Sequence, residues 1–232
     1  NDVTGSSIYR EDTRTFEFRK GPLFANFLLA DEINRSSART QSSLLEAMQE
    51  LQVSYDGVTH ALPAPFMTFA TQNPIEQEGT YPLPLAQLDR FMFKVNMTYP
   101  PPDDEIRVLA EHHATAGLSA SAESGVQKVM TKDQLLDARN VIRETFVREE
   151  VIRYVQRLLQ ATRDDESLTV GASPRAGLML IMAAKSLARF SGRDYVNPDD
   201  IKSALLPVMR HRVVLSSSAE LEGMTADEIL SR

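Results

Sequence analysis

Two adjacent carboxylates follow a short apolar run in the first part of the chain. The run Phe24–Ala30 (FANFLLA) is almost continuously apolar, and Asp31 and Glu32 come directly after it. One carboxylate can hold Mg²⁺, usually through water, and the second can polarise an attacking water molecule. The pair therefore fits the hydrolysis of a Mg²⁺-bound nucleotide. The alternative is that both acids only stabilise the N-terminus of the following helix.

A polar residue also follows a second apolar run, Phe66–Ala70. Thr71, Gln72 and Asn73 come next, and Pro74 ends the phrase. An Asn at the tip of a neighbouring strand can hydrogen-bond both an attacking water and a terminal phosphate. Asn-Pro is also a frequent start of a loop, so a simple turn stays open at this point.

Two arginines occupy positions where a guanidinium could meet a phosphate. Arg90 follows Asp89, and a guanidinium there could neutralise charge on a transferring phosphoryl group, even one held by a neighbouring subunit. The alternative for Arg90 is a surface ion pair with Asp89 or Glu76. Arg175 lies in the first turn of a helix that Ser173 caps, where its charge opposes the helix dipole. An anion beside this helix N-terminus would satisfy both charges.

The elements that must hold Asp31, Glu32 and Asn73 form an α/β unit. The patterns predict strands over 24–30, 66–70 and 91–95 and a helix over 36–51. The order strand, helix, hairpin, strand predicts parallel pairing of 24–30 with 66–70, and the apolar run predicts a strand buried on both faces. In such sheets, polar residues beyond the carboxyl ends of the strands line the ligand crevice.

Two hairpins and a set of helices complete the predicted elements. Residues 7–18 and 53–60 predict hairpins, the second through an Asp56-Gly57 turn. Pro100–Pro102 interrupts the chain before a helix that begins with acidic residues, and Gly117–Gly125 has the composition of a linker. Beyond it, N-capping residues precede three helical patterns, which predicts a small bundle over about 126–212; these are Thr131, Ser173 and Asn197.

Composition limits the class of protein. The chain has 232 residues, no Cys and a net charge of −7, which favours two packed units and excludes a disulfide framework or a thiolate metal site. Both halves are acidic, so nucleic acid is a weak candidate for the main partner. No apolar run is long enough to cross a bilayer, and we expect a cytoplasmic protein without membrane insertion. The four histidines lack metal-ligand spacing and are predicted to be solvated or on helix surfaces; they are His60, His112, His113 and His211.

Together and in this order, the motifs resemble those of the AAA+ ATPases, specifically the MoxR family. The likeness covers nearly the whole chain, in the phrases DVTGSSIY, FEFRKGPLFANFLLADEINR, TQSSLLEAMQE, FATQNPIEQEGTYPLPLAQLDRF, GASPRA and GRDYVNPDDIK. The resemblance implies ATP and Mg²⁺ as ligands and a partial parallel-sheet core of the P-loop NTPase type, followed by a small all-α lid. It also makes the two hairpins the helix-2 insert and the pre-sensor-1 hairpin.

The resemblance also implies a role for each candidate residue. Asp31 and Glu32 match the Walker B acids, for Mg²⁺ and the catalytic water respectively. Asn73 matches sensor 1. Arg90 matches the arginine finger that acts across a subunit interface, and Arg175 matches sensor 2 on the lid, closing on the γ-phosphate. The family further implies a homo-oligomeric, hexameric ring that works with von Willebrand factor A domain proteins to remodel, assemble or mature a client protein.

One family motif is absent from this sequence. No GxxxxGK[ST] phosphate loop occurs in the 232 residues, and in the family that loop lies upstream of the position of Asn1. We therefore expect the chain to be the C-terminal portion of a longer protein. Residues 1–115 would form part of the AAA+ core, and residues 126–232 would form the helical lid.

Two other functions stay open from the sequence. Because the phosphate loop is missing, the chain as given could be a nucleotide-independent protein-interaction module. A DNA-acting ATPase of the MCM type would need basic hairpin tips. The 53–60 hairpin offers Asp56 and His60 but neither Lys nor Arg, which ranks that function low.

Overall fold

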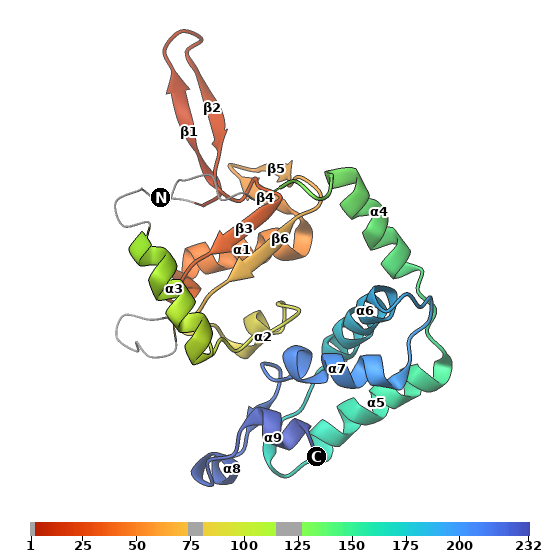
Figure 1. Ribbon diagram of the computed structural model, residues 1–232. Helices are drawn as coiled ribbons and strands as arrows, with labels where there is room; N and C mark the ends of the chain where they lie inside the picture. The colour runs from red at the N-terminus through yellow and green to blue at the C-terminus, as the bar shows by residue number, and fades with distance from the viewer. Residues whose placement is uncertain (1–2, 74–80, 115–126) are drawn as a thin grey trace.

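The computed structural model describes residues 3–73, 81–114 and 127–232 (Figure 1). An α/β part comes first and a helical part follows. The strands of the described residues are β1 Gly5–Arg10, β2 Thr15–Lys20, β3 Phe27–Ala30, β4 Gln52–Tyr55, β5 Val58–Ala61, β6 Met67–Ala70, β7 Leu168–Val170 and β8 Val214–Leu215. The helices are η1 Ile33–Arg35, α1 Ala38–Glu50, α2 Leu85–Leu88, α3 Pro102–Ala114, α4 Lys132–Arg143, α5 Glu149–Asp164, α6 Pro174–Phe190, α7 Pro198–Met209, α8 Ser217–Leu221 and α9 Ala226–Leu230.

The predicted parallel pair is confirmed. Strands β3 and β6 pair in parallel, with Ala30 opposite Ala70, so both strands end at the same edge. Helix α1 lies behind this pair (Figure 1) and contributes Leu44 and Leu45 to the core of the α/β part. The side chain of Leu28 on β3 packs against that core, and burial of this apolar face stabilises the unit.

The prediction that the first apolar run is buried on both faces is wrong. Phe27 and Leu29 of β3 are 55% and 66% exposed, and Met67 and Phe69 of β6 are exposed beside them. Alternation along a strand sends successive side chains to opposite faces. Helix α1 covers one face of the pair, and no element of the described residues covers the other.

The strand predicted over 91–95 is also absent. The chain bends at Phe91 and Met92, continues without regular structure, and pairs with no strand in the described part of the chain. Its backbone groups bond to the helical part instead: the N–H of Lys94 donates to the carbonyl of Pro207 at 2.8 Å, and Arg212 donates to the carbonyl of Met92 at 3.2 Å. The hydrogen-bond partners beside this segment thus decide its structure, because a strand forms only next to another strand whose backbone groups are free to pair.

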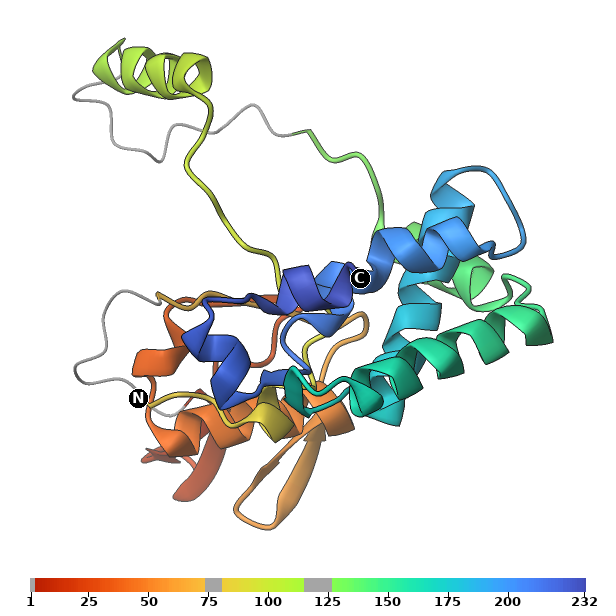
Figure 2. The same ribbon diagram turned by 90° about the horizontal axis from the view of Figure 1, so that it is seen from below.

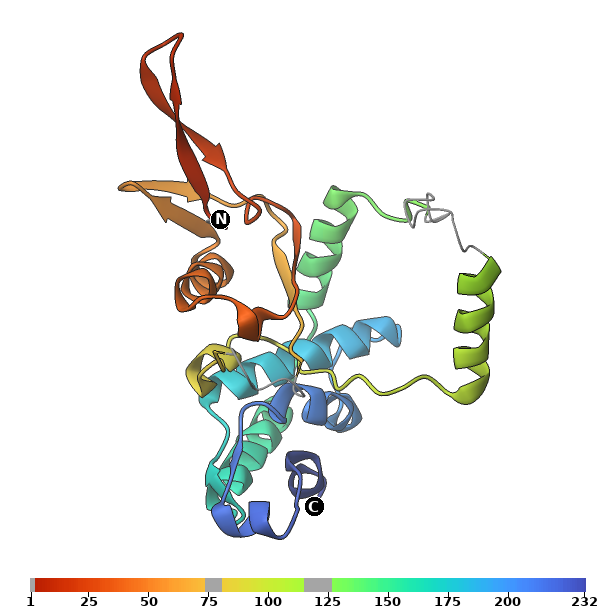
Figure 3. The ribbon, with the colours of Figure 1, turned by 90° about the vertical axis from the view of Figure 1, so that its left-hand side faces the viewer.

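Helix α3 follows this segment, as the three prolines and the acidic residues predict. Asp103, Asp104 and Glu105 lie in its first turn, where they complement the helix dipole. The helix stands away from the other elements in two views (Figures 2 and 3), and its apolar side chains Ile106 and Leu109 are exposed. The predicted linker Gly117–Gly125 lies outside the described residues.

The helical bundle is confirmed, together with the three predicted caps. The side chains of Thr131, Ser173 and Asn197 accept from backbone N–H groups in the first turns of α4, α6 and α7. Helices α5, α6 and α7 share one apolar core. Gly177 allows α6 to approach α5, because a Cβ at this position would lie 2.8 Å from Cδ1 of Leu159.

Both predicted hairpins are present. Strands β1 and β2 pair around residues 11–14 and project from the α/β part (Figure 1), and β4 and β5 pair around Asp56 and Gly57, which both have positive φ. The imidazole of His60 stacks on the ring of Phe18 at 4.4 Å, joining the two hairpins, so His60 is not simply solvated as predicted. Among the described residues, no helix combines the length and apolar character that a membrane span requires.

Candidate functional site

The hydroxyl of Thr71 connects the two adjacent carboxylate residues at the edge where β3 and β6 end. It donates to Oδ1 of Asp31 at 2.5 Å and accepts from the N–H of Glu32 at 2.8 Å. The register that sets Ala30 opposite Ala70 also makes Thr71 the neighbour of Asp31. Thr71 therefore fixes the turn that presents both acids, a role that only the pairing register reveals.

Glu32 adopts a left-handed backbone conformation, with φ 46° and ψ 53°. Residues with a Cβ enter this region at a cost of about 1 kcal/mol, and such strain persists where surrounding contacts enforce it. Here the Thr71 hydroxyl holds the N–H of Glu32. The Glu32 carboxylate lies 3.2 Å from Nε of Arg35 and is about two-fifths exposed, so it remains accessible to water.

Asn73 lies two residues beyond Thr71 on the same edge. Its backbone carbonyl accepts from Nδ2 of Asn34 at 3.2 Å. The backbone of Asn34 is also fixed, because its carbonyl accepts a hydrogen bond from the N–H of Tyr81 at 2.6 Å. Oδ1 of Asn34 is buried and has no hydrogen-bond partner among the described residues. The structure thus brings Asp31, Glu32 and Asn73 to one edge, as the strand order predicts.

The donor set at this edge suits a hard cation. Asp31 and Thr71 offer carboxylate and hydroxyl oxygens, which are the ligands that Mg²⁺ prefers. In the part of the chain that the structure describes, no three His, Asp or Glu side chains cluster as a ready metal cage. Mg²⁺ sites of nucleotide-binding proteins use one or two carboxylates, and substrate phosphates and waters supply the remaining ligands, so Asp31 fits such a site.

The two candidate arginines line a common pocket of about 270 Å³. Arg90 follows α2, and Arg175 lies in the first turn of α6, which belongs to the helical part. The other walls are Met179 of α6 and the last turn of α1, with residues 48–50. Nε of Arg90 is buried without a partner among the described residues. The two guanidinium groups outnumber the one carboxylate of the lining, that of Glu50, which favours an anion in the pocket.

This arginine pocket is remote from the carboxylates along α1. The acids precede Ser37, the N-cap of α1, whereas the pocket contacts residues 48–50 at the other end. At 1.5 Å per residue, the 12 positions from Ser37 to Gln49 span about 18 Å. The structure therefore gathers the predicted residues in two places, three at the sheet edge and two in the arginine pocket.

The alternative role of Arg90, an ion pair with Asp89, is not observed. Asp89 pairs instead with Arg212, whose Nε lies 2.8 Å from Oδ1 of Asp89. The other partner considered, Glu76, lies outside the described residues. The partner choice of Asp89 depends on a residue 123 positions away in sequence, so the local pattern around Arg90 could not reveal it.

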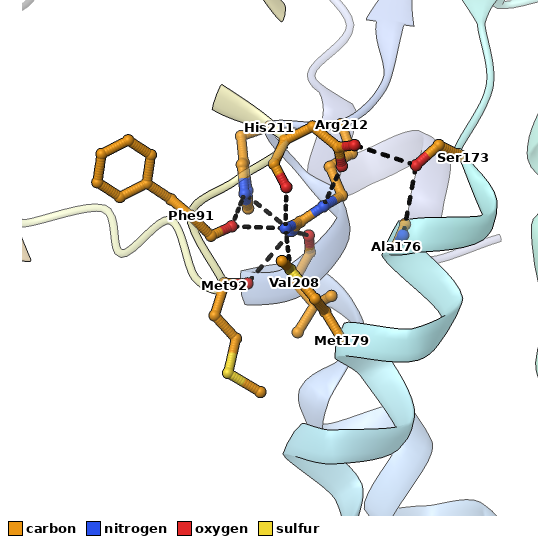
Figure 4. Close-up of polar contacts among 9 residues, drawn as sticks. Phe91, Met92, Ser173, Ala176, Met179, Val208, His211 and Arg212 are labelled. Atoms are coloured by element: carbon orange, nitrogen blue, oxygen red, sulfur yellow. Dashed lines mark hydrogen bonds and ion pairs between the residues drawn. The ribbon is translucent and has the colours of Figure 1, made fainter. Parts of the chain in front are cut away.

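Arg212 is the centre of a buried polar network (Figure 4). Its side chain is 1% exposed and donates to the carbonyls of Asp89 at 2.9 Å, Phe91 at 2.5 Å and Met92 at 3.2 Å, and also to that of Val208. Burial lowers the pKa of Arg212, and the hydrogen bond and charge of Asp89 oppose that shift. A buried guanidinium with this many acceptors is well satisfied and joins the segment after Arg90 to the helical part.

His211 is buried, so the prediction of a solvated or surface position is wrong. Its Nε2 lies 2.9 Å from the carbonyl oxygen of Phe91 and 2.8 Å from a guanidinium nitrogen of Arg212. Burial lowers the pKa of His211 to about 4; the charges of Arg212 and Lys94 act in the same direction, against the Phe91 carbonyl and Asp89. The imidazole is therefore neutral at pH 7.

This neutral histidine predicts that the folded state loses stability as the pH is lowered from about 6.5 toward 4. The folded state releases the His211 proton near pH 4, whereas an unfolded chain holds it up to about pH 6.5. Acidification from pH 6.5 toward pH 4 therefore favours unfolding, by up to about 3 kcal/mol from this group. Urea unfolding at pH 7 and pH 4.5 measures the change. The variant H211Q should show a smaller pH-dependent loss than the wild type, and the exposed-site variant H113Q should not; an equal loss in H211Q would contradict the assignment.

Comparisons with known proteins agree with this architecture. The family model described as "ATPase family associated with various cellular activities (AAA)" matches residues 1–93, and the model of the AAA lid domain matches residues 160–232. The parallel pair with strand-end acids, followed by a helical lid, thus defines an AAA+ type of protein.

Individual relatives give the narrower family. The chain is 42% identical to Chaperone MoxR1 of Mycobacterium tuberculosis, covering 100% of this chain and 62% of the relative. It is also 42% identical to the uncharacterised YeaC of Bacillus subtilis, covering 99% of this chain and 70% of the relative. A solved structure of a candidate ATPase from Cytophaga hutchinsonii superposes with a TM-score of 0.88 at 41% identity, over 99% of this chain and 71% of that one. The chain belongs to the MoxR family of AAA+ ATPases.

Proposed function

We propose that this chain carries the water-activating and phosphate-sensing residues of an ATPase that remodels partner proteins. The observation that carries the proposal is the pair of hydrogen bonds that the Thr71 hydroxyl makes with Asp31 and with the N–H of Glu32, which we call the Thr71 bridge. It holds both acids at the end of a parallel strand. The chain spans 62% of the length of its Mycobacterium tuberculosis relative, so the proposal concerns the full-length protein.

Each residue at the sheet edge has a distinct task in this reaction. Glu32 accepts a proton from, or polarises, the water that attacks the terminal phosphate of ATP. Asp31 accepts from the Thr71 hydroxyl through Oδ1 and would hold Mg²⁺, usually through water; the bound ion would neutralise charge on the phosphates. Asn73 hydrogen-bonds the attacking water and the γ-phosphate, which aligns the two for in-line displacement.

The separation of the arginine pocket supports an oligomer. The acids precede the N-cap of α1, and about 18 Å of this helix separates that N-cap from the pocket, which supports a role for Arg90 and Arg175 away from a phosphate held by the acids of the same copy. We propose that both arginines meet the nucleotide of a neighbouring copy. For Arg175 this replaces closure on its own nucleotide, the role implied by family resemblance. Such a head-to-tail contact closes into a ring, for which the family suggests six copies.

The proposed partners are proteins. We propose a cytoplasmic ring that acts with a von Willebrand factor A domain protein to assemble or mature a client. The support is the family membership, the name chaperone carried by the Mycobacterium tuberculosis relative, and the net charge of −7, which disfavours a nucleic-acid backbone. Co-purification of such a protein with the nucleotide-loaded ring tests this part.

The full-length protein should hydrolyse ATP only with Mg²⁺, and D31N should need more of the ion. Removing the carboxylate charge weakens the orientation of Mg²⁺, so we expect half-maximal Mg²⁺ to rise by about tenfold. Phosphate release is measured across a Mg²⁺ series, with D56N at a hairpin tip as the matched control. A protein that neither binds nor hydrolyses ATP would favour the nucleotide-independent interaction module instead.

A further inference from the structure

One part-buried carboxylate, that of Asp89, bonds to residues next to both arginines of the pocket. Asp89 directly precedes Arg90 in the chain, and its two side-chain oxygens have different partners. Oδ1 accepts from Nε of Arg212 at 2.8 Å, and Oδ2 accepts from the hydroxyl of Ser173 at 3.2 Å. Asp89 therefore connects the α/β part with two elements of the lid.

Ser173 extends this connection to Arg175. Its hydroxyl donates to Asp89 and also accepts from the N–H of Ala176 at 3.4 Å, which makes it the N-cap of α6. Arg175 is the second residue of that helix, so the first turn that carries it is tied to Asp89. The charge of Arg175 lowers the pKa of Arg212, which indicates that the two guanidinium groups lie in the same neighbourhood.

Arg212 fixes the chain on the other side of Arg90. It donates to the backbone carbonyls of Asp89, Phe91 and Met92, so residues before and after Arg90 are held by one guanidinium. The backbone bond from Lys94 to Pro207, at 2.8 Å, continues the attachment. A rigid guanidinium fork with this many acceptors permits little movement of the segment.

From these contacts we infer that Asp89 and Arg212 are positioning residues, which hold Arg90 and Arg175 at a fixed separation so that both engage one phosphate group. The inference rests on the proposed function. It adds that the pair acts as a unit: the lid arginine cannot move without the segment that carries Arg90. Neither Asp89 nor Arg212 lines the pocket, so both act through the two arginines.

A second ion pair of the lid provides a matched control. Nη2 of Arg193 lies 2.6 Å from Oδ1 of Asp200, whose carboxylate is buried and also accepts from the backbone N–H of Asn197, the N-cap of α7. This pair does not line the arginine pocket. Loss of charge at Asp200 should therefore lower stability as loss at Asp89 does, without disturbing the arginines.

ATP turnover of the full-length ring distinguishes positioning from stability. D89N should lower kcat by about 10- to 100-fold, since small misplacements of catalytic groups have effects of this size, while KM for ATP changes less than about threefold. D200N should keep kcat within about twofold of the wild type. S173G removes the link to Asp89 at little cost to the helix, so it tests the same point if D89N folds poorly.

A double-mutant comparison of kcat tests whether Asp89 acts through the arginines. If Asp89 acts through the two arginines, then D89N should lower kcat by less than about twofold in a background that already carries both R90K and R175K. A full additive loss, or a kcat of D89N and S173G equal to that of D200N, would overturn the inference.

Hydrogen exchange gives a readout that needs no turnover. The amides of residues 91–94 should lose protection in D89N and keep it in D200N, because the Lys94–Pro207 bond depends on the Arg212 network. Unchanged protection in D89N would overturn the inference. A wild-type ring without ATP turnover would instead contradict the proposed function, so the two failures are distinguishable.

Discussion

The variant E32Q of the full-length protein is expected to bind ATP normally and to lose about 10²- to 10⁴-fold in kcat, the range for removal of a general base. The amide has the shape of the carboxylate but accepts no proton and carries no charge. The Thr71 bridge holds the backbone N–H of Glu32, which the substitution keeps, so the turn should persist. Phosphate release under saturating ATP and binding of a fluorescent ATP analogue measure the two quantities.

A comparison variant makes this result specific. E11Q changes a Glu in the turn between β1 and β2, far in sequence from the strand ends, and should leave kcat unchanged. If E32Q also turns over ATP at the wild-type rate, Glu32 does not activate water. A parallel loss of ATP binding in E32Q would mean that the residue supports nucleotide affinity instead.

A mixture of E32Q and R90A copies is expected to regain turnover that neither variant has alone. R90A should lose about 10³-fold or more, the usual effect of removing an arginine finger. If Arg90 serves the neighbouring copy, then a random equal mixture forms complete sites at about a quarter of its interfaces, because E32Q supplies the arginine and R90A supplies the base.

The mixture distinguishes action between copies from action within one. If Arg90 served its own nucleotide, each copy would keep its own defect, and the mixture would show only the average of the two parents. Each variant measured alone at the total protein concentration of the mixture controls for concentration. R175A in place of R90A tests whether the lid arginine serves the neighbouring copy in the same way.

Local patterns predicted the elements that depend on local chemistry. The apolar runs, the Asp56-Gly57 turn and the caps at Thr131 and Ser173 all appear in the structure, since each depends on residues a few positions apart. The strand expected over 91–95 failed because its outcome depends on which backbone groups lie beside it. The backbone of this segment bonds instead to α7 and to the side chain of Arg212.

The site residues also separate into those that local patterns place and those that depend on distant packing. Asp31, Glu32 and Asn73 could be placed together because parallel strands share an edge, and the register then adds Thr71. Their sequence neighbourhoods could not show that the two arginines share a pocket, because the pocket is formed by α6 of the lid, the residue after α2 and the last turn of α1. The roles of Arg212 and His211 were hidden for the same reason, since their partners are about 120 positions away.

The length of α1 also sets a stoichiometry. If the two ends of this helix serve different nucleotides, one isolated copy holds two half-sites and no complete one. An open row of n copies then has n − 1 complete sites, and closing the row adds the last. Turnover per copy would rise with assembly even though no residue changes its conformation. Dilution alone could switch the enzyme off.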